Sequence, residues 1–135
     1  FYYEPNMTEG VVRHAFDVWM DPAAQFFTEW RDAGEYSQNV GPSVRFDGSG
    51  QVTVAGRVLA QMPAQTWFRV EIEAALGKAA PRTFQVKLTP AGGATQTFAG
   101  LPISGTEFRE LVWLGYSSTA AADTVFYLDN VTFTP

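Results

Sequence analysis

The closing stretch, residues 124–133, constrains the fold of this chain more than any other part of the sequence. It is dense in β-branched and aromatic side chains, as strands are, and it ends just before the last residue, Pro135. A strand this apolar cannot be left as a loose end. We therefore expect it to be inserted between earlier strands, most simply beside the first one, where it would seal the core. The Asp129-Asn130 pair predicts a local kink or bulge in its alternation. The side chains expected to point inward are Phe126, Leu128, Val131 and Phe133.

The rest of the chain shows the same kind of pattern. Alternating apolar and polar residues, separated by turn signals, predict about ten short strands. No window has the periodicity of an amphipathic helix, and no internal repeat is present. These features favour a single antiparallel β-sandwich of the jelly-roll type, with a closed barrel as the alternative. The predicted strands are residues 11–20, 26–32, 43–47, 51–55, 57–61, 66–74, 82–89, 95–98, 108–116 and 124–133.

Composition excludes several classes of function. Hydrophobic residues make up 46% of the 135 residues, which is enough for a packed core and argues against disorder. The absence of cysteine removes disulfides, thiol nucleophiles and thiolate metal sites. A net charge of -5 argues against nucleic acid and anionic membrane surfaces as partners. No apolar run is long enough to span a membrane. Because the chain begins at Phe1, we expect a domain processed or excised from a larger protein.

Aromatic and planar polar side chains are the candidates for ligand binding. A sugar ring is apolar on its faces and polar at its rim, so its recognition needs flat aromatic rings beside hydrogen-bonding groups. For each candidate, packing in the core of the sandwich is the alternative role, and Trp67 and Tyr127 are expected to be core residues. The candidate aromatics are Trp19, Trp30, Tyr36 and Trp113, and their candidate polar partners are Glu29, Arg31, Gln38 and Asn39.

Two predicted strands locate the candidate site. Residues 111–114 (Leu-Val-Trp-Leu) are apolar on both faces, so one side must be covered by something other than the main core. Glu29 and Arg31 share one face of their strand, where they would either pair with each other or hold sugar hydroxyls. Tyr36 follows in the next loop. We therefore expect a ligand site on the sheet face that strands 26–32 and 108–116 share.

No constellation indicates catalysis. His14, the only histidine, shares a strand face with Val12 and Phe16, so we expect a hydrogen-bonded core histidine. No serine or cysteine elbow accompanies it. The glycines lie in turns and are not followed by a helix, which excludes a phosphate-binding loop. The sequence predicts a protein that is not an enzyme.

Four stretches carry a resemblance to a known family. Residues 10–18, 50–54 (Gly-Gln-Val-Thr-Val), 63–72 and 126–131 (Phe-Tyr-Leu-Asp-Asn-Val) resemble the concanavalin A-like lectin/glucanase superfamily. They are most similar to its laminin-G-like jelly rolls in bacterial extracellular proteins, in which a Trp opens a strand across the sandwich and an aromatic-x-Asp-Asn-Val strand ends the domain. A similar Tyr-x-Asp-Asn-Val ending occurs in galactose-binding-like carbohydrate modules. Family members are commonly longer, so the resemblance implies that an N-terminal strand is missing here or supplied elsewhere.

The resemblance implies a fold often used to bind glycans, without carrying over a site. Catalytic members place Glu-x-Asp-x-x-Glu on one strand, and Glu71-Ile72-Glu73 lacks both the Asp and the third Glu. Such jelly rolls often bind a structural Ca²⁺, for which Asp129, Asp47 and Glu4 are the available carboxylates. No calcium-binding loop is present, so we expect neither a metal nor another cofactor.

These features together predict a non-catalytic carbohydrate-binding or accessory module of an extracellular or periplasmic protein. Its partners would be a glycan or a neighbouring domain of the same parent protein. A structural interaction domain is the alternative, and a glycoside hydrolase or lyase would need a second carboxylate in the cleft.

Overall fold

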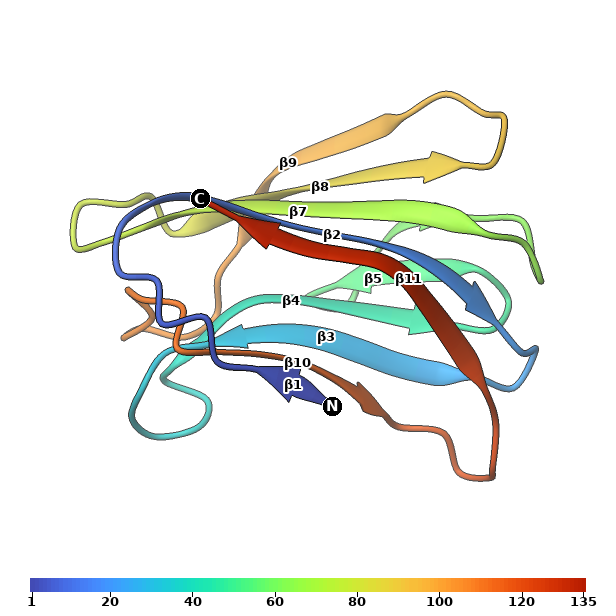
Figure 1. The fold of residues 1–135 in the computed structure, drawn as a ribbon, viewed down its shortest axis with the longest axis horizontal. Coiled ribbons are helices and arrows are strands. Elements are labelled where there is room, and N and C mark those ends of the chain that lie inside the picture. The colour runs from blue at the N-terminus through green and yellow to red at the C-terminus, as the bar shows by residue number, and fades with distance from the viewer.

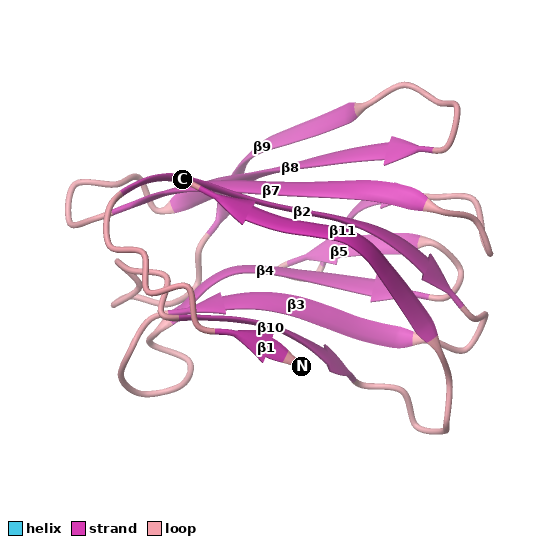
Figure 2. Cartoon of the chain, in the orientation of Figure 1, coloured by secondary structure: helices cyan, strands magenta, loops and turns pink.

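Eleven strands and no helix make up the protein in the computed structural model, which describes residues 1–135 (Figure 2). No segment therefore forms a helix long and apolar enough to cross a membrane. The strands are β1 (Tyr2–Tyr3), β2 (Gly10–Met20), β3 (Gln25–Arg31), β4 (Val40–Asp47), β5 (Gln51–Val54), β6 (Arg57–Gln61), β7 (Phe68–Leu76), β8 (Thr83–Pro90), β9 (Gln96–Pro102), β10 (Trp113–Ser118) and β11 (Phe126–Thr134).

The strands form two antiparallel sheets that face each other across the core (Figure 1). The six-stranded sheet has the order β1-β10-β3-β4-β5-β6, and the five-stranded sheet has the order β11-β2-β7-β8-β9. Each sheet keeps two free edges, so the molecule is a sandwich and not a closed barrel. The predicted antiparallel β-sandwich is confirmed.

Alternation along the strands builds the core. In β7 the burial pattern alternates strictly over nine residues, with Phe68, Val70 and Ile72 inside and Arg69 and Glu71 half-buried on the outer face. The partner strand β8 alternates in the same way. Each sheet buries one face in the core, so its other face is open to the surroundings.

The closing strand β11 pairs with β2, as expected, but lies at the edge of its sheet. The expected insertion between two strands is therefore wrong: the second neighbour of β2 is β7, which occupies the position that an inserted β11 would need. Its alternate side chains pack against the core as predicted. The register shifts between Asp129 and Thr132, and Asn130 has φ of 49°, a conformation that asparagine tolerates better than most residues. The predicted bulge is confirmed.

The turn between β4 and β5 follows from its sequence. The Asp47 side chain accepts a hydrogen bond from the backbone N–H of Ser49 at 3.0 Å, and Gly50 has φ of 94°. A side chain at Gly50 would collide with the carbonyl of Met62. The hairpin predicted at Asp47-Gly48-Ser49-Gly50 is confirmed.

The predicted strand 108–116 begins only at Trp113. The backbone N–H groups of Arg109 and Glu110 donate to one carboxylate oxygen of Asp32, at 2.8 and 2.9 Å, so this segment turns around a side chain instead of pairing with β3. Leu111 forms an isolated bridge with Met7 and is fully buried.

A polar network joins the two sheets inside the core. Trp30 of β3 donates its indole N–H to Nδ1 of His14 on β2 at 3.2 Å, and Nε2 of His14 lies 2.5 Å from the hydroxyl oxygen of Tyr116 on β10. Because indole only donates, Nδ1 must be the acceptor, so neutral His14 carries its proton on Nε2 and donates it to Tyr116. Burial lowers the pKa of His14 to about 3, and burial, with a smaller effect of the Tyr3 charge, raises the pKa of Tyr116. The predicted hydrogen-bonded core histidine is confirmed.

Candidate functional site

The outer face of the six-stranded sheet carries the polar groups that the sequence indicated. Along β3, Phe26, Thr28 and Trp30 point into the core and are almost fully buried. The alternate residues Glu29 and Arg31 therefore point outward, toward the face opposite the core. Trp113 on β10 is the direct cross-strand partner of Arg31.

Glu29 is an unusually buried carboxylate for an outer sheet face, with 5% of its surface exposed. Its Oε1 accepts a hydrogen bond from Nε of Arg31 at 2.7 Å, and its Oε2 accepts one from the Ser43 hydroxyl at 3.2 Å. Ser43 is the cross-strand partner of Glu29 on β4. The carboxylate is thus held in one orientation by a charged and a neutral donor.

The Arg31 guanidinium lies between two aromatic rings. Its central carbon is 4.1 Å from the centre of the Trp113 ring and 4.6 Å from that of Tyr36, within the range of cation–π attraction. Tyr2 of β1 stacks on Trp113 with ring centres 5.9 Å apart and 24° between the ring planes. Because β10 lies between β1 and β3, Tyr2 and Arg31 reach Trp113 from opposite sides. We call Tyr2, Trp113, Arg31 and Tyr36 the aromatic stack.

Gly115 makes room for this stack. A β-carbon at this position would collide with the outer ring atoms of Trp113, so the indole lies over the backbone of its own strand. With Tyr2 on one side and Arg31 on the other, Trp113 has no free ring face for a ligand. The open rings are those at the two ends of the stack, Tyr2 at 58% exposure and Tyr36 at 61%.

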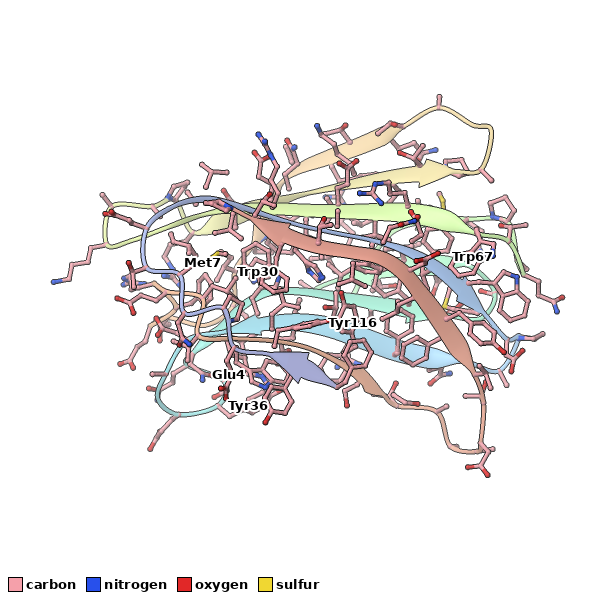
Figure 3. All side chains as sticks on the ribbon, in the orientation of Figure 1. Glu4, Met7, Trp30, Tyr36, Trp67 and Tyr116 are labelled. Atoms are coloured by element: carbon pink, nitrogen blue, oxygen red, sulfur yellow. The ribbon has the colours of Figure 1, made fainter.

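A hollow of about 360 Å³ opens beside Tyr36 and Glu29. Its lining includes the Glu29 carboxylate, the Arg45 guanidinium, several hydroxyl groups and the Tyr36 ring. Figure 3 shows Tyr36 outside the six-stranded sheet, whereas Trp30 and Tyr116 lie between the sheets. The lining side chains that can hydrogen-bond are Glu29, Tyr36, Ser37, Ser43, Arg45, Thr53 and Ser104.

The structure brings together four of the six predicted site residues. Glu29, Arg31, Tyr36 and Trp113 are in contact or share the hollow, on the face that strands β3 and β10 form. The two others lie elsewhere. Trp30 has no exposed surface and donates to His14 in the core, so it is not available to a ligand.

Trp19 belongs to the opposite sheet. It lies on β2 beside Tyr127 of β11, with ring centres 5.7 Å apart. Of the candidate polar partners, Asn39 is buried, and its side chain donates to the backbone carbonyl of Asp32 at 2.6 Å. Trp67 and Tyr127, expected in the core, are 42% and 54% exposed, because each occupies an outward position of its strand pattern.

Sequence reasoning missed Ser43, Arg45, Thr53 and Tyr2. Ser43 and Arg45 alternate along β4 with the buried Val44, and this alternation is the signal that could have placed them on the outer face. Arg45 is the cross-strand partner of both Phe27 and Thr53, which places all three on the face that carries Glu29. No local signal pointed to Tyr2, since its strand pairs with β10, more than 100 residues later.

The carboxylates considered for calcium do not assemble into a metal site. The structure holds no group of three or more His, Asp or Glu side chains placed to bind an ion. Asp47 instead accepts hydrogen bonds within its hairpin, and Asp129 accepts one from the backbone N–H of Asn130.

Comparison with known proteins supports the architecture alone. No protein-family model matches the sequence, and no curated protein matches it significantly. Among solved structures, that of an ancestral congerin is similar, with a TM-score of 0.54, 12% sequence identity and 99% of each chain covered. A structure of SCP-B, a member of the eqolisin family of peptidases, in complex with a tripeptide has a TM-score of 0.49 and 11% identity, with 99% of this chain and 71% of that one covered. The latter likeness is too loose to support an argument.

The class of protein that these comparisons and the strand order define is a jelly-roll β-sandwich. The narrower resemblance to the laminin-G-like group of the concanavalin A-like superfamily is not confirmed by them.

Proposed function

We propose that the protein is a non-catalytic carbohydrate-binding module whose ligand lies on the outer face of the six-stranded sheet. The observation that carries this proposal is the hollow in which the exposed Tyr36 ring stands beside the oriented Glu29 carboxylate. An open aromatic ring next to fixed planar polar groups suits a sugar ring, which is apolar on its faces and polar at its rim.

The hollow offers complementary groups for sugar hydroxyls. The Glu29 carboxylate accepts hydrogen bonds, Arg45 donates them, and Ser43 and Thr53 do both. Arg31 contributes indirectly, since it fixes the orientation of Glu29 and supports the ring of Tyr36. Because the Glu29 carboxylate is already held in one orientation, it loses little conformational entropy when it binds a hydroxyl, and this favours affinity.

The same geometry does not suit glycoside hydrolysis. That reaction needs two carboxyl groups on either side of the scissile bond. Glu29 is the only carboxylate that lines the hollow, and both of its oxygens already accept hydrogen bonds from the protein. Glu71 and Glu73 lie on β7 in the other sheet. A binding role therefore fits the site better than a catalytic one.

A glycan array followed by calorimetry tests the proposal. A stacked ring contributes on the order of 1 kcal/mol, so Tyr36→Ala should weaken binding of the best oligosaccharide about five- to tenfold. Tyr36→Phe should retain most of the affinity, and Arg45→Ala and Ser43→Ala should each weaken it. Val125→Ala, at an exposed residue in a loop of the chain, is the matched control. Unchanged affinity in Tyr36→Ala, Arg31→Ala and Trp113→Ala would place the site elsewhere.

A structural interaction domain is the second candidate. Phe1 and Tyr2, at 63% and 58% exposure, leave two aromatic rings open at the edge of the six-stranded sheet where β1 lies, and a neighbouring domain of the parent protein would cover them. In that case the isolated module should show no glycan affinity and should self-associate in sedimentation. For either role we place the protein outside the cytoplasm, extracellular or periplasmic. Fractionation of the native host with an antibody against the module tests this location.

A further inference from the structure

Three aromatic residues lie in line on the other face of the molecule, the outer face of the five-stranded sheet. Tyr127 and Trp19 are direct cross-strand partners on β11 and β2. Val18 pairs with Phe68, the first residue of β7, so an extension of this register places Trp67, directly before β7, next to Trp19 of β2. With neighbouring strands about 4.8 Å apart, the row extends roughly 10 Å across the sheet. The view with side chains shows Trp67 at the end of the sandwich where β7 begins (Figure 3).

A polar row runs alongside these aromatic residues. Asp129 faces Asp17, Asp17 faces Arg69, and Arg69 faces Thr89 across four adjacent strands. Asp17 accepts hydrogen bonds from Arg69 at 3.1 Å and from the Asn130 side chain at 2.7 Å, one on each oxygen. Asp129 is exposed, and its Oδ1 accepts only the backbone N–H of Asn130.

The two rows meet at a hollow of about 490 Å³. The Trp67 indole lines it from the aromatic row, and Asp17, Asp129, Arg69 and Thr89 line it from the polar row. The bulge at Asn130 shapes this site, because it turns the Asn130 amide toward Asp17 and leaves the Asp129 carboxylate at the rim.

We propose that this hollow is a second saccharide-binding site, separate from the one on the six-stranded sheet. Trp67 would stack on a sugar ring, while Asp129 and Arg69 would bind its hydroxyls. A protein partner fits less well, because the centres of protein interfaces are depleted in charged residues. Here two carboxylates and a guanidinium directly adjoin the exposed indole. The Tyr127–Trp19 pair continues the aromatic row and would hold a neighbouring ring of an oligosaccharide.

The two sites would face away from each other, since they lie on the outer faces of opposite sheets. A single module would then engage two glycan chains at once, or two stretches of one flexible chain. Its binding to a polysaccharide would exceed its affinity for a short oligosaccharide by an avidity effect.

Oligosaccharide microarrays separate the two sites. The arrays carry β-glucan, xylan, mannan and galactan oligosaccharides, and they are probed with the wild type, Tyr36→Ala, Trp67→Ala and the double variant. We expect each single variant to keep part of the wild-type signals and the double variant to lose them all. In calorimetry with the strongest oligosaccharide, Trp67→Ala and Asp129→Asn should each weaken the second binding event about five- to tenfold. Val125→Ala should match the wild type. Trp67 and Asp129 are at the surface, so these variants are expected to fold.

A spectroscopic readout accompanies the affinities. The indole N–H resonance of Trp67, assigned with Trp67→Phe, should shift on adding the oligosaccharide, while that of the buried Trp30 serves as the reference. Loss of all binding in Tyr36→Ala alone, or binding that Trp67→Ala and Asp129→Asn leave unchanged, would overturn the second site but leave the first. If Trp67→Ala abolished all binding and Tyr36→Ala left binding unchanged, the first site would be overturned and the second would stand. An array without signals from the wild type would overturn both.

Discussion

The guanidinium of Arg31 lies 4.1 Å from the centre of the Trp113 ring, and the two residues are direct partners in the ladder between β3 and β10. This contact connects the edge strand β1, through Tyr2, to the loop after β3, through Tyr36. It also occupies the indole face that a sugar would otherwise use. Trp113 therefore acts indirectly, by packing against Arg31, and the aromatic ring open to a ligand next to the hollow is that of Tyr36.

The Glu29–Arg31 pair should show strong energetic coupling. Arg31→Ala leaves the Glu29 carboxylate, which is 5% exposed, without its charged donor, and we expect a loss of roughly 2–4 kcal/mol in the free energy of unfolding. Glu29→Gln combined with Arg31→Ala should cost less than the sum of the single changes. Urea unfolding of the four proteins gives the coupling energy. Arg13→Ala, at an exposed ion pair, is the control and should have no measurable effect.

Tyr116→Phe should destabilise the protein without creating a cavity. It removes the acceptor of the His14 Nε2 proton and leaves a buried donor unpaired, at a cost of about 1–3 kcal/mol. Tyr36→Phe makes the same chemical change at a residue with 61% exposure and should leave stability unchanged. Equal denaturation midpoints for the two variants would contradict the assigned tautomer and the network.

Stability should fall as pH falls below about 6.5, because of His14. Above this pH the residue is neutral in both the folded and the unfolded chain. Below it, the unfolded chain binds a proton that the folded chain excludes until about pH 3, where the lowered pKa of His14 lies. Unfolding then takes up a proton, so the free energy of unfolding should drop by about 2 kcal/mol between about pH 7.5 and pH 5.

Denaturant unfolding at several pH values measures this slope. His14 is the only histidine, and the side-chain carboxyl groups ordinarily titrate below about pH 5, so His14 is the only side chain expected to titrate in this interval. A free energy of unfolding that stays constant over this range would show that His14 accepts a proton in the folded state.

Deletion of residues 129–135 should impair folding severely. It removes two thirds of β11, including Val131 and Phe133, which pack against the core. Because these side chains are only partly buried, we expect a loss of roughly 2–4 kcal/mol, a large share of the stability of a typical domain. Deletion of Pro135 alone is the control. Calorimetric melting of the shortened chain near the full-length temperature would contradict the role of this strand.

Much of the candidate site could be predicted from alternation along single strands. Glu29 and Arg31 are two residues apart, so they share one face of their strand. Residues 111–114 are apolar on both faces, which led to the prediction that Trp113 lies beside this pair, and Trp113 does pair with Arg31. The same parity argues against Trp30 in the site, because a residue between Glu29 and Arg31 must point the other way, into the core. Trp67, directly before the inward Phe68, is exposed for the same reason.

What the sequence left open depends on pairing between distant segments. Tyr2 joins the aromatic stack only because β1 pairs with β10, and nothing local to residue 2 indicates that partner. The start of β10 at Trp113 reflects the Asp32 carboxylate, which binds the backbone at Arg109 and Glu110 from a distant loop. Side-chain-to-backbone contacts of this range leave no periodic signal in the chain.

The ladder between β2 and β11 has a consequence for how the molecule forms. It joins residues 13–20 to residues 126–134, so its hydrogen bonds close a loop of more than 100 residues. Such non-local pairing carries a high entropic cost before any contact compensates for it, which makes folding slow. During synthesis β2 leaves the ribosome about 100 residues before β11 does, so it finds this partner late. Until then the outer edge of β2 stays open to other chains, and this interval is when the protein is most exposed to aggregation.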